Sequence, residues 1–453
     1  MIARARQHGV VLAPRSVFEH QAVETLAKVA GSAWGTVVGD PVNQLPLTPV
    51  MHWLFARDGS FNHLSQSVLL TVPKGVDVLH ITTAIDTLLG RHDMLRAQLE
   101  SGTLRVRPLG AIRASDVLQR CIANSGLCEA VATQSRIAVA ALNPAAGVMM
   151  RATWFDRGVD RSSRLLLTLH QLVVDGASWR ILMADLALMW AGRSLRPVGT
   201  SFQTWARSLP ARARSTAGLN RWLEVGAGAG GRLDCRPLDP TLDIMATMRS
   251  LNATLPPEQT GRLIETAPAA SGSQITDVLL TALVRAIGQD HLLVDVETHG
   301  RDELDPEMDL TRTVGWFTAV HPVRLRLGGH HVHGGDPVDY GLLRWLNPDT
   351  GPTLAALPSA QITFSYLGRI TAPGDGDWTL APESAVVASG MDMRLACTHV
   401  LDVTVIVRDS ADGPEVNATW TWPSRLLSQG RVESLVGCWL RELGLLARDA
   451  RAR

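Results

Sequence analysis

The chain has 453 residues, more than one compact core usually supports, so its length predicts two substantial domains. A content of 46% hydrophobic and 19% charged residues argues against a disordered or fibrous protein. The formal charge is zero, from 43 basic and 43 acidic residues, and no stretch reaches the roughly 18 apolar residues of a membrane span. Neither nucleic acid nor a membrane is therefore expected as a partner.

The N-terminus and the cysteines both favour a cytoplasmic protein. Residues 1–7 carry charge, but no apolar segment follows them as it would in a secretory signal. The cysteines are odd in number, widely spaced and without a CxxC pair: Cys121, Cys128, Cys235, Cys397 and Cys438. Such cysteines are typical of reduced thiols in a reducing compartment rather than of disulfides or zinc ligands.

The first half of the chain predicts helices and strands in alternation. Residues 1–30 have a helical pattern, and residues 39–46 are a polar linker. The patterns that follow predict in turn a strand, a helix, a buried strand and an amphipathic helix: residues 62–71, 81–89, 164–169 and 181–190. The glycine-rich residues 226–231 lack the following helix that a phosphate-binding loop needs, so we interpret them as a flexible linker.

The second half shows a similar mixture. Two helices and then four strands are predicted in chain order: residues 257–266, 276–287, 292–297, 361–366, 400–407 and 416–422. Because both halves mix strands with helices, the sequence predicts an α/β fold with two lobes. We place the N-terminal lobe at residues 40–225 and the C-terminal lobe at residues 232–453.

The most informative segment runs from residue 165 to residue 186. An apolar strand ends at His170, Asp175 and Gly176 then turn the chain, and a helix follows. Loops that follow strands are where a rigid scaffold presents reactive groups. The simpler interpretation is that His170 lies at the edge of the core and that Asp175 caps the helix.

This segment resembles the HHxxxDG motif of the condensation-domain superfamily of nonribosomal peptide synthetases, and residues 178–186 are especially similar to its epimerization branch. Five further segments resemble family motifs in the same order along the chain: residues 46–67, 91–96, 296–301, 309–323 and 364–368. Residues 296–301, VETHGR, look like the EGHGR element of the epimerization branch. The resemblance implies two chloramphenicol-acetyltransferase-like lobes that form a V-shaped pseudo-dimer with a central channel.

The N-terminus carries a second resemblance. Residues 3–21 look like the last helices of a peptidyl carrier domain, which directly precedes an epimerization domain in such synthetases. This implies that residues 1–30 are the C-terminal helices of a truncated carrier domain, whose phosphopantetheine-bearing segment would lie before Met1. A generic N-terminal helix is the alternative interpretation.

The sequence departs from the family at the catalytic histidine. The family places that histidine four residues before the aspartate of the motif, and here the position holds Gln171. A carboxamide does not titrate near pH 7, so Gln171 cannot act as a general acid or base. His170 matches the first, mainly structural histidine of the family. It cannot simply replace its neighbour, because adjacent side chains on an extended strand point to opposite faces.

By resemblance, Glu297 is the partner of the missing histidine in the catalytic pair. It shares one face of the predicted strand with Leu293 and Asp295, and its carboxylate near the strand's end would point into a cleft between the lobes. Burial there would raise the proton affinity of a carboxylate toward that of a useful base. The alternative is that Glu297 lies on a solvated strand face.

The other motif residues are expected to position these groups. Asp175 would orient the motif through an arginine, and the candidates that the sequence cannot separate are Arg91, Arg96 and Arg301. Tyr366 belongs to the NYLG-like element, and Gly176 completes the HQxxxDG motif. The histidines at 330, 331 and 333 lie between glycines without further ligands, so no metal site is predicted.

The resemblance implies inversion of the α-carbon of an aminoacyl or peptidyl thioester. The substrate would be presented on the phosphopantetheine arm of a peptidyl carrier domain, with other synthetase modules as partners and no directly bound cofactor. Gln171 predicts an impaired reaction, as does a region from 325 to 340 that looks shorter than in the family. Two alternatives stay open: an inactive carrier-binding or scaffold module, and a condensation-type acyltransferase.

Overall fold

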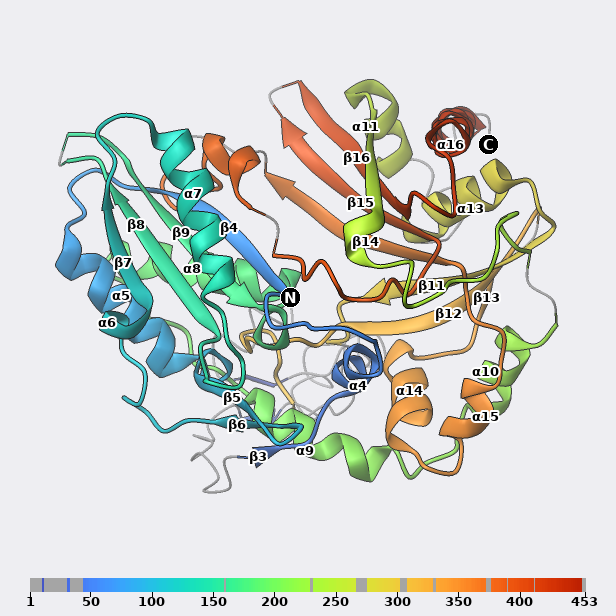
Figure 1. Ribbon diagram of the computed structural model, residues 1–453, viewed down its shortest axis with the longest axis horizontal. Helices are drawn as coiled ribbons and strands as arrows, with labels where there is room; N and C mark the ends of the chain where they lie inside the picture. Colours follow the sequence, from blue (N-terminus) through green and yellow to red (C-terminus); the bar gives the residue numbers. More distant parts are fainter. Residues whose placement is uncertain are drawn as a thin grey trace.

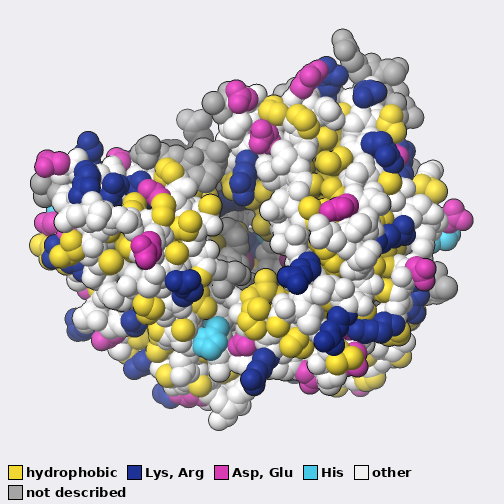
Figure 2. Space-filling view, turned by 45° about the horizontal axis from the view of Figure 1, so that its top comes forward, with side chains coloured by type: hydrophobic (Ala, Val, Ile, Leu, Met, Phe, Trp, Pro, Cys, Tyr) yellow, Lys and Arg dark blue, Asp and Glu magenta, His cyan; other side chains and the backbone are white. Residues whose placement is uncertain are grey.

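The computed structural model describes residues 10–11, 31–32 and 44–449, apart from 159, 229–230, 266–274, 302–307, 329–330, 372–375, 389 and 411. Two mixed α/β lobes lie side by side in it, each built on its own sheet (Figure 1). The space-filling view shows a hollow between them (Figure 2). The α/β fold with two lobes that the sequence predicts is confirmed.

The sheet of the N-terminal lobe has four strands. Their order is β4 (Ser65–Val72), β9 (Ser163–His170), β8 (Met150–Asp156) and β7 (Leu118–Ile122). Every residue of β9 is buried, and its side chains alternate between two cores. Leu167 and Leu169 face the helices α5 (Val78–Arg91) and α8 (Gly176–Trp190), whereas Leu166 faces α7 (Leu127–Ala140). A strand buried on both faces explains the continuous apolar run in the sequence.

Shorter elements complete this half of the chain. They are β3 (Gln44–Leu45), α4 (Pro49–Phe55), η1 (Asp93–Arg96), β5 (Ala97–Glu100), β6 (Thr103–Val106), α6 (Ala114–Val117), η2 (Gln171–Val173), α9 (Phe202–Arg212) and α10 (Leu219–Gly226). Strands β3, β6 and β5 form a separate small sheet.

The sheet of the C-terminal lobe has seven strands. Their order is β10 (Met248–Leu255), β16 (Gly413–Pro423), β15 (Leu401–Ser410), β14 (Ile362–Thr371), β11 (His291–Thr298), β12 (Ala319–Arg326) and β13 (Val332–His333). Strand β14 runs parallel to both of its neighbours, β11 and β15, and the other pairs are antiparallel. The centre of this sheet therefore joins segments that are far apart in the chain.

The two faces of this sheet differ in polarity. Helices α11 (Pro257–Glu265), α13 (Ile275–Ile287) and α16 (Gln429–Asp449) pack on one face (Figure 1). Along β15, Val403 and Val405 are buried against them, whereas the alternate residues Asp402 and Thr404 are only half-buried. Strand side chains alternate between faces, so the opposite face carries polar groups.

Part of that opposite face is covered near β12. Helices α10, α14 (Pro337–Gly341) and α15 (Gly351–Ala355), with the π-helical turn η4 (Leu342–Leu346), gather there. Their side chains bury Leu293 of β11. Farther along β11 the same face carries Asp295 and Glu297, which are only half-buried. We call this uncovered polar face the cleft face.

A segment of the C-terminal half crosses to the N-terminal lobe. Residues 376–388 and 390–397 include the short helix η5 (Pro382–Val386) and run along the edge strand β4. The amide of Ala381 donates to the carbonyl of Leu69 at 2.9 Å, and the amide of Thr71 donates to the carbonyl of Thr379 at 2.9 Å. The crossing segment thus covers a strand edge that would otherwise be free to pair.

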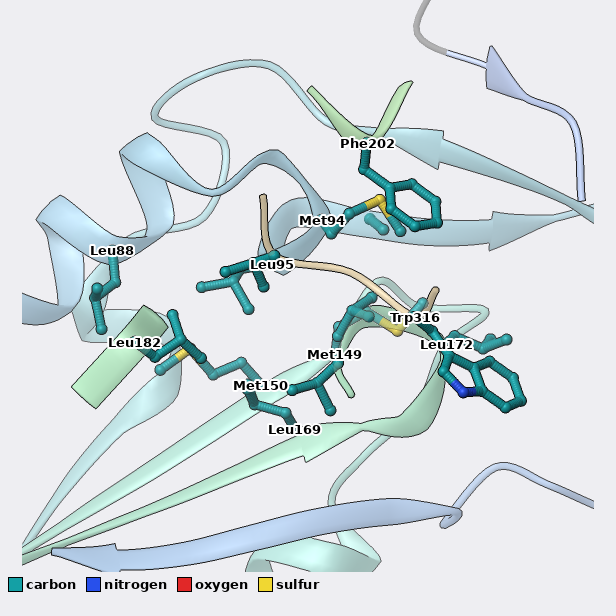
Figure 3. Close-up of a cluster of buried hydrophobic side chains, with 14 of the residues drawn as sticks. Leu88, Met94, Leu95, Met149, Met150, Leu169, Leu172, Leu182, Phe202 and Trp316 are labelled. Carbon is teal, nitrogen blue, oxygen red and sulfur yellow. The ribbon is translucent and has the colours of Figure 1, made fainter. Parts of the chain in front are cut away.

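The cores do not follow the predicted division at residues 226–231. Trp316 and Phe317 belong to the buried cluster of the N-terminal lobe, and Trp316 packs beside Leu172 (Figure 3). Gly226 ends α10, and the amide of Gly231 donates to the carbonyl of His291 at 2.8 Å, so these two ends of the glycine-rich segment are packed rather than free.

The proposed carrier-domain tail, residues 1–30, lies outside the described residues except for one short strand. Val10–Val11 (β1) pairs antiparallel with Gly31–Ser32 (β2). The carrier assignment stays a prediction. Among the described residues, no helix combines the length and apolarity that a membrane crossing requires.

Candidate functional site

His170 is the last residue of β9, and its side chain is fully buried. Nε2 donates to the carbonyl of Phe61 at 2.8 Å, and Nδ1 accepts from the amide of Leu172 at 3.2 Å. Burial lowers the pKa of His170 to about 4, and the hydrogen bond to Phe61 offsets only part of this. Both ring nitrogens are engaged, so His170 shapes the turn and has no nitrogen left for a substrate.

Gln171 begins the 3-10 turn η2 and is half-buried. The indole N–H of Trp179 donates to Oε1 of Gln66 at 2.7 Å, and Nε2 of Gln66 donates to Oε1 of Gln171 at 3.0 Å. Because an indole nitrogen can only donate, this chain has one possible direction. The side-chain carbonyl of Gln171 therefore accepts a hydrogen bond from Gln66. The side-chain NH2 group of Gln171 is left as its hydrogen-bond donor.

Asp175 is the N-cap of α8, and its Oδ1 accepts the amide of Ser178 at 2.8 Å. Arg301 of the opposite lobe binds both carboxylate oxygens through Nη2, at 2.8 and 3.0 Å. The amide of Phe317 donates to Oδ2 at 3.2 Å, and the guanidinium of Arg301 lies 4.0 Å from the centre of the Phe317 ring. Asp175 therefore caps its helix and joins the two lobes at the same time.

The structure separates the three arginines that the sequence offered as partners for Asp175. Arg301 is the partner. Arg91 lies with Nε 3.6 Å from Asp185 of α8, in a buried group that also contains His92 and Arg312. Arg96 donates to backbone carbonyls, including that of Arg107 at 3.2 Å. Arg91 and Arg96 thus support the N-terminal lobe away from the motif turn.

Glu297 lies near the end of β11 on the cleft face. The hydroxyl of Ser365 on β14 donates to its Oε2 at 2.6 Å, and the two residues are directly paired in the β11–β14 register. Tyr366, the next residue, faces the other side of the sheet and packs against the hydrophobic core. Burial raises the pKa of Tyr366, so it is a neutral phenol near pH 7.

The ion pair between Asp175 and Arg301 joins the two chain segments that carry the predicted catalytic positions. Gln171 precedes Asp175 by four residues, and Glu297 precedes Arg301 by four residues. Four residues span at most about 14 Å, so each backbone position lies within that reach of its own member of the ion pair. The joint itself is buried, with 6% of the Asp175 side chain and 10% of the Arg301 side chain exposed.

A small apolar cavity adjoins this site. It measures about 20 Å³, space for about one water molecule, and residues of α4, α9 and β12 line it, including Thr48, Trp53, Trp205 and Val320. Val320 stands directly opposite Glu297 in the β11–β12 register, so the cavity lies beside the cleft face. Gly176, at the start of α8, has open space where a side chain would be.

The described residues contain no group of three histidines, cysteines or carboxylates placed to hold a metal ion. Of the clustered histidines, His330 lies outside the described residues. Nε2 of His331 lies 3.0 Å from the hydroxyl of Thr281, and Nε2 of His333 lies 3.5 Å from Oδ1 of Asp277. Both bind neighbouring protein groups.

Several residues at the site were not assigned a role from the sequence. Ser365 could have been found, because strand alternation places it on the same face as a polar residue of β11. Gln66 and Trp179 occur in the quoted motifs, but nothing in their spacing shows that they hydrogen bond to each other. His399 and Asp402, near the N-terminal end of β15, are adjacent to Glu297 only through the sheet.

The two-lobed fold and the HQxxxDG turn at the junction of the lobes define a condensation-domain architecture. Residues 43–333 match the condensation-domain family, and the chain belongs to that family. The structure is similar to the epimerization domain from the third module of tyrocidine synthetase B, with a TM-score of 0.79, 22% identity, and coverage of 92% of this chain and 100% of that one. The first condensation domain of the CDA synthetase gives a TM-score of 0.56 at 18% identity, covering 90% and 96%. These likenesses show the fold.

By sequence, the chain is similar to parts of long synthases. The chain is 31% identical to one of the linear gramicidin synthase subunits of Brevibacillus parabrevis over 98% of its own length, and 32% identical to chondramide synthase cmdD of Chondromyces crocatus over 96%. It spans only 9% and 12% of those two proteins. The resemblance to nonribosomal peptide synthetase domains that the motifs indicate is confirmed at the level of the family.

Proposed function

We propose that this chain is an epimerization-type domain that inverts the α-carbon of a carrier-bound aminoacyl or peptidyl thioester. The observation that carries the proposal is the position of Glu297. Its carboxylate lies on the cleft face, bound by Ser365 and four residues from the arginine that joins the lobes. The fold it shares with an epimerization domain supports the proposal.

In the proposed reaction, the Glu297 carboxylate takes the α-proton. The electron pair of the C–H bond stays on the substrate as a thioester enolate, and Glu297 becomes a carboxylic acid. The donor end of the Gln171 amide can hydrogen bond to the enolate oxygen, where negative charge develops. Gln171 cannot return a proton to the opposite face, so water must supply it there. The hydroxide that remains is neutralised by the proton that Glu297 releases to solvent, which restores the carboxylate.

The substrate would arrive on the phosphopantetheine arm of a peptidyl carrier domain, and other synthetase modules would be its further partners. The chemistry needs no directly bound cofactor, because a carboxylate, an amide donor and water suffice. A cytoplasmic location, where such synthetases meet their aminoacyl substrates, is part of this proposal.

Deuterium exchange tests the proposal. A cognate carrier loaded with an L-aminoacyl group is mixed with the protein in deuterated water, and deuterium at the α-carbon is followed by mass spectrometry. We expect slow incorporation above a control without protein, and its loss in Glu297→Gln. Incorporation that persists in Glu297→Gln would refute Glu297 as the base.

Gln171→His restores a titratable group and should raise the exchange rate by about 10²- to 10⁴-fold, the usual contribution of a general acid or base. The matched control is Gln203→His, which places a histidine on α9 outside the motif. If the exchange rate does not increase in a folded Gln171→His variant, the rest of the site cannot support α-proton exchange.

One observation favours a second candidate, a carrier-binding module without catalysis. The side-chain carbonyl of Gln171 already accepts a hydrogen bond from Gln66 within the protein, as expected of a residue with a structural role. Carrier binding without deuterium incorporation, in both the parent protein and Gln171→His, would select this alternative.

A further inference from the structure

A second group of titratable side chains lies on the cleft face beside Glu297. It consists of Asp295 on β11, His399 in the turn before β15, and Asp402 on β15. Nε2 of His399 lies 2.9 Å from Oδ2 of Asp295, and Nδ1 lies 3.9 Å from Oδ1 of Asp402. The proposed reaction assigns no part to this group.

The sheet register explains why these residues meet. On β11, Asp295 pairs with Thr363 of β14, and Thr363 pairs in turn with Asp402 of β15. Paired residues point to the same face, so Asp295 and Asp402 share a face two strands apart. Glu297 lies two residues beyond Asp295 and therefore shares that face as well.

Burial makes the charges of this group interact strongly. The side chain of His399 is 4% exposed, and those of Asp295 and Asp402 are 24% and 32% exposed. Oδ1 of Asp402 is enclosed and has no hydrogen-bond partner among the described residues. An enclosed carboxylate oxygen without a donor is unfavourable, and a proton held on that carboxyl group relieves it.

The pKa values of His399 and Asp402 agree with a proton held within this group. Burial opposes the charge on His399, yet the hydrogen bond to Asp295 and the negative charges of Asp295, Asp402 and Glu297 raise the pKa of His399. Burial raises the pKa of Asp402 to about 6; His399 and Arg57 oppose the rise, and Glu297 adds to it. Asp402 therefore changes charge at a pH of about 6, and His399 holds its proton more firmly than a free histidine.

The other titratable groups around this site keep one charge state near neutral pH. Burial raises the pKa of Cys397 to about 12 and also raises that of Tyr340, so both are neutral. Burial lowers the pKa of His321 to about 4, so it too is neutral. Arg57 of the N-terminal lobe carries a fixed positive charge and donates to the carbonyl of Ala396 at 2.6 Å.

We propose that His399 and Asp402 are positioning residues that, with Asp295, hold a shared proton beside Glu297 and so control the charge that Glu297 meets when it takes the α-proton. This role rests on the proposed epimerization. His399 and Asp402 then titrate as a coupled pair, and protonation of Asp402 removes a negative charge next to the base. Asp295, His399 and Asp402 thus provide a titrating group in the C-terminal lobe, whereas the N-terminal lobe lacks the histidine that the family has at the position of Gln171.

The coupling can be measured without turnover. Histidine-selective NMR follows the titration of His399, which the spectrum of His399→Gln assigns. Replacing Glu297 by Gln removes a nearby negative charge but keeps an acceptor for Ser365, so the titration midpoint of His399 should fall by about one pH unit. Asp402→Asn should lower it similarly. The exposed Asp409→Asn on the same strand should leave it unchanged. An unchanged midpoint in Glu297→Gln would overturn the inference.

The pH profile of deuterium exchange gives the second measurement. The rate should rise as Asp402 ionises through pH of about 6, because an added negative charge strengthens the neighbouring base. Asp402→Asn should lose this step without a change in KM for the loaded carrier, and Asp402→Glu should restore it. A step that persists in Asp402→Asn contradicts the inference. If no variant exchanges at all, the proposed function fails, and the NMR titration still decides whether the network exists.

Discussion

His170 shows how a single residue can belong to a catalytic motif and still be structural. Its two ring nitrogens hydrogen bond to backbone groups on either side of the turn, Phe61 and Leu172. A protonated ring could not accept from the amide of Leu172, so the native turn requires the neutral form. The residue therefore sets the position of Gln171 by remaining uncharged.

This predicts an acid-sensitive stability. An unfolded histidine has a pKa of about 6.5, whereas burial lowers the pKa of His170 to about 4 in the folded protein. Between these values the unfolded state binds a proton that the folded state does not, so the free energy of unfolding falls as the pH decreases from about 6.5 to about 4. The loss reaches about 3 kcal/mol for one such histidine.

His170→Asn should keep the acceptor for Leu172 and reduce this loss. Urea unfolding at several pH values between 4 and 7 measures it, and the solvent-exposed His291→Asn is the control. Equal pH dependence in His170→Asn and the parent protein would contradict the assignment. His321, whose pKa burial also lowers to about 4, should keep part of the acid sensitivity in the variant.

At the scale of elements, the predicted strands β11, β14, β15 and β16 and the helices α11 and α13 occur within a few residues of their expected positions. Their alternating or helical patterns are strong because one face is buried against a core.

Strands β7, β8, β10 and β12 were not predicted. Strand β12 shows why, because Pro322 and Arg324 interrupt its apolar pattern. Pairing with β11 stabilises it, and pairing is not a local property.

The turn after β11 depends on one glycine. Gly300 has φ +60°, and a Cβ there would lie 1.8 Å from the carbonyl oxygen of Phe317. Because that oxygen belongs to the backbone, it cannot move aside without displacing the Phe317 amide from Asp175. The glycine thus allows the segment that follows Glu297 to approach Phe317, whose amide binds the capping residue Asp175.

Gly300→Ala should therefore destabilise the protein by clearly more than the roughly 1–2 kcal/mol of a left-handed conformation alone. Gly288→Ala is a matched control, since Gly288 has φ +73° and nothing within 4 Å of the added Cβ. Denaturant unfolding of both variants measures the difference. Equal destabilisation would show that the close approach to Phe317 is unimportant.

At the scale of the whole molecule, the two lobes are joined by buried contacts rather than by the chain alone. The pair of Asp175 and Arg301 joins them at the motif turn, and the crossing segment adds the pair of Arg164 and Glu383 at 2.7 Å. Removing one partner of a buried ion pair leaves an uncompensated charge. The stability of the molecule should therefore depend on the junction of the lobes.

Arg301→Gln should lower the free energy of unfolding by about 3–5 kcal/mol, as expected for a buried pair. Arg369→Gln is the comparison, because its pair with Asp409 is exposed and should contribute at most about 1 kcal/mol. Thermal and denaturant unfolding measure both. A loss in Arg301→Gln no larger than in Arg369→Gln would contradict a buried, stabilising junction.

The sequence by itself determined the family, the α/β fold and the absence of a titratable side chain at position 171. These properties are recorded in residue identity and in the periodicity of apolar positions. It also indicated Glu297 and limited the partners of Asp175 to three arginines. Each motif behind these inferences is a short run of residues that can be recognised without knowing how the chain folds.

Only the tertiary structure decided which arginine pairs with Asp175, which way the amide of Gln171 faces, and that His399 and Asp402 lie beside Glu297. The physical reason is that these contacts join residues about a hundred or more positions apart, for example His399 and Asp295. Strand pairing and the packing of the lobes bring them together, and the spacing of residues along the chain carries no record of either.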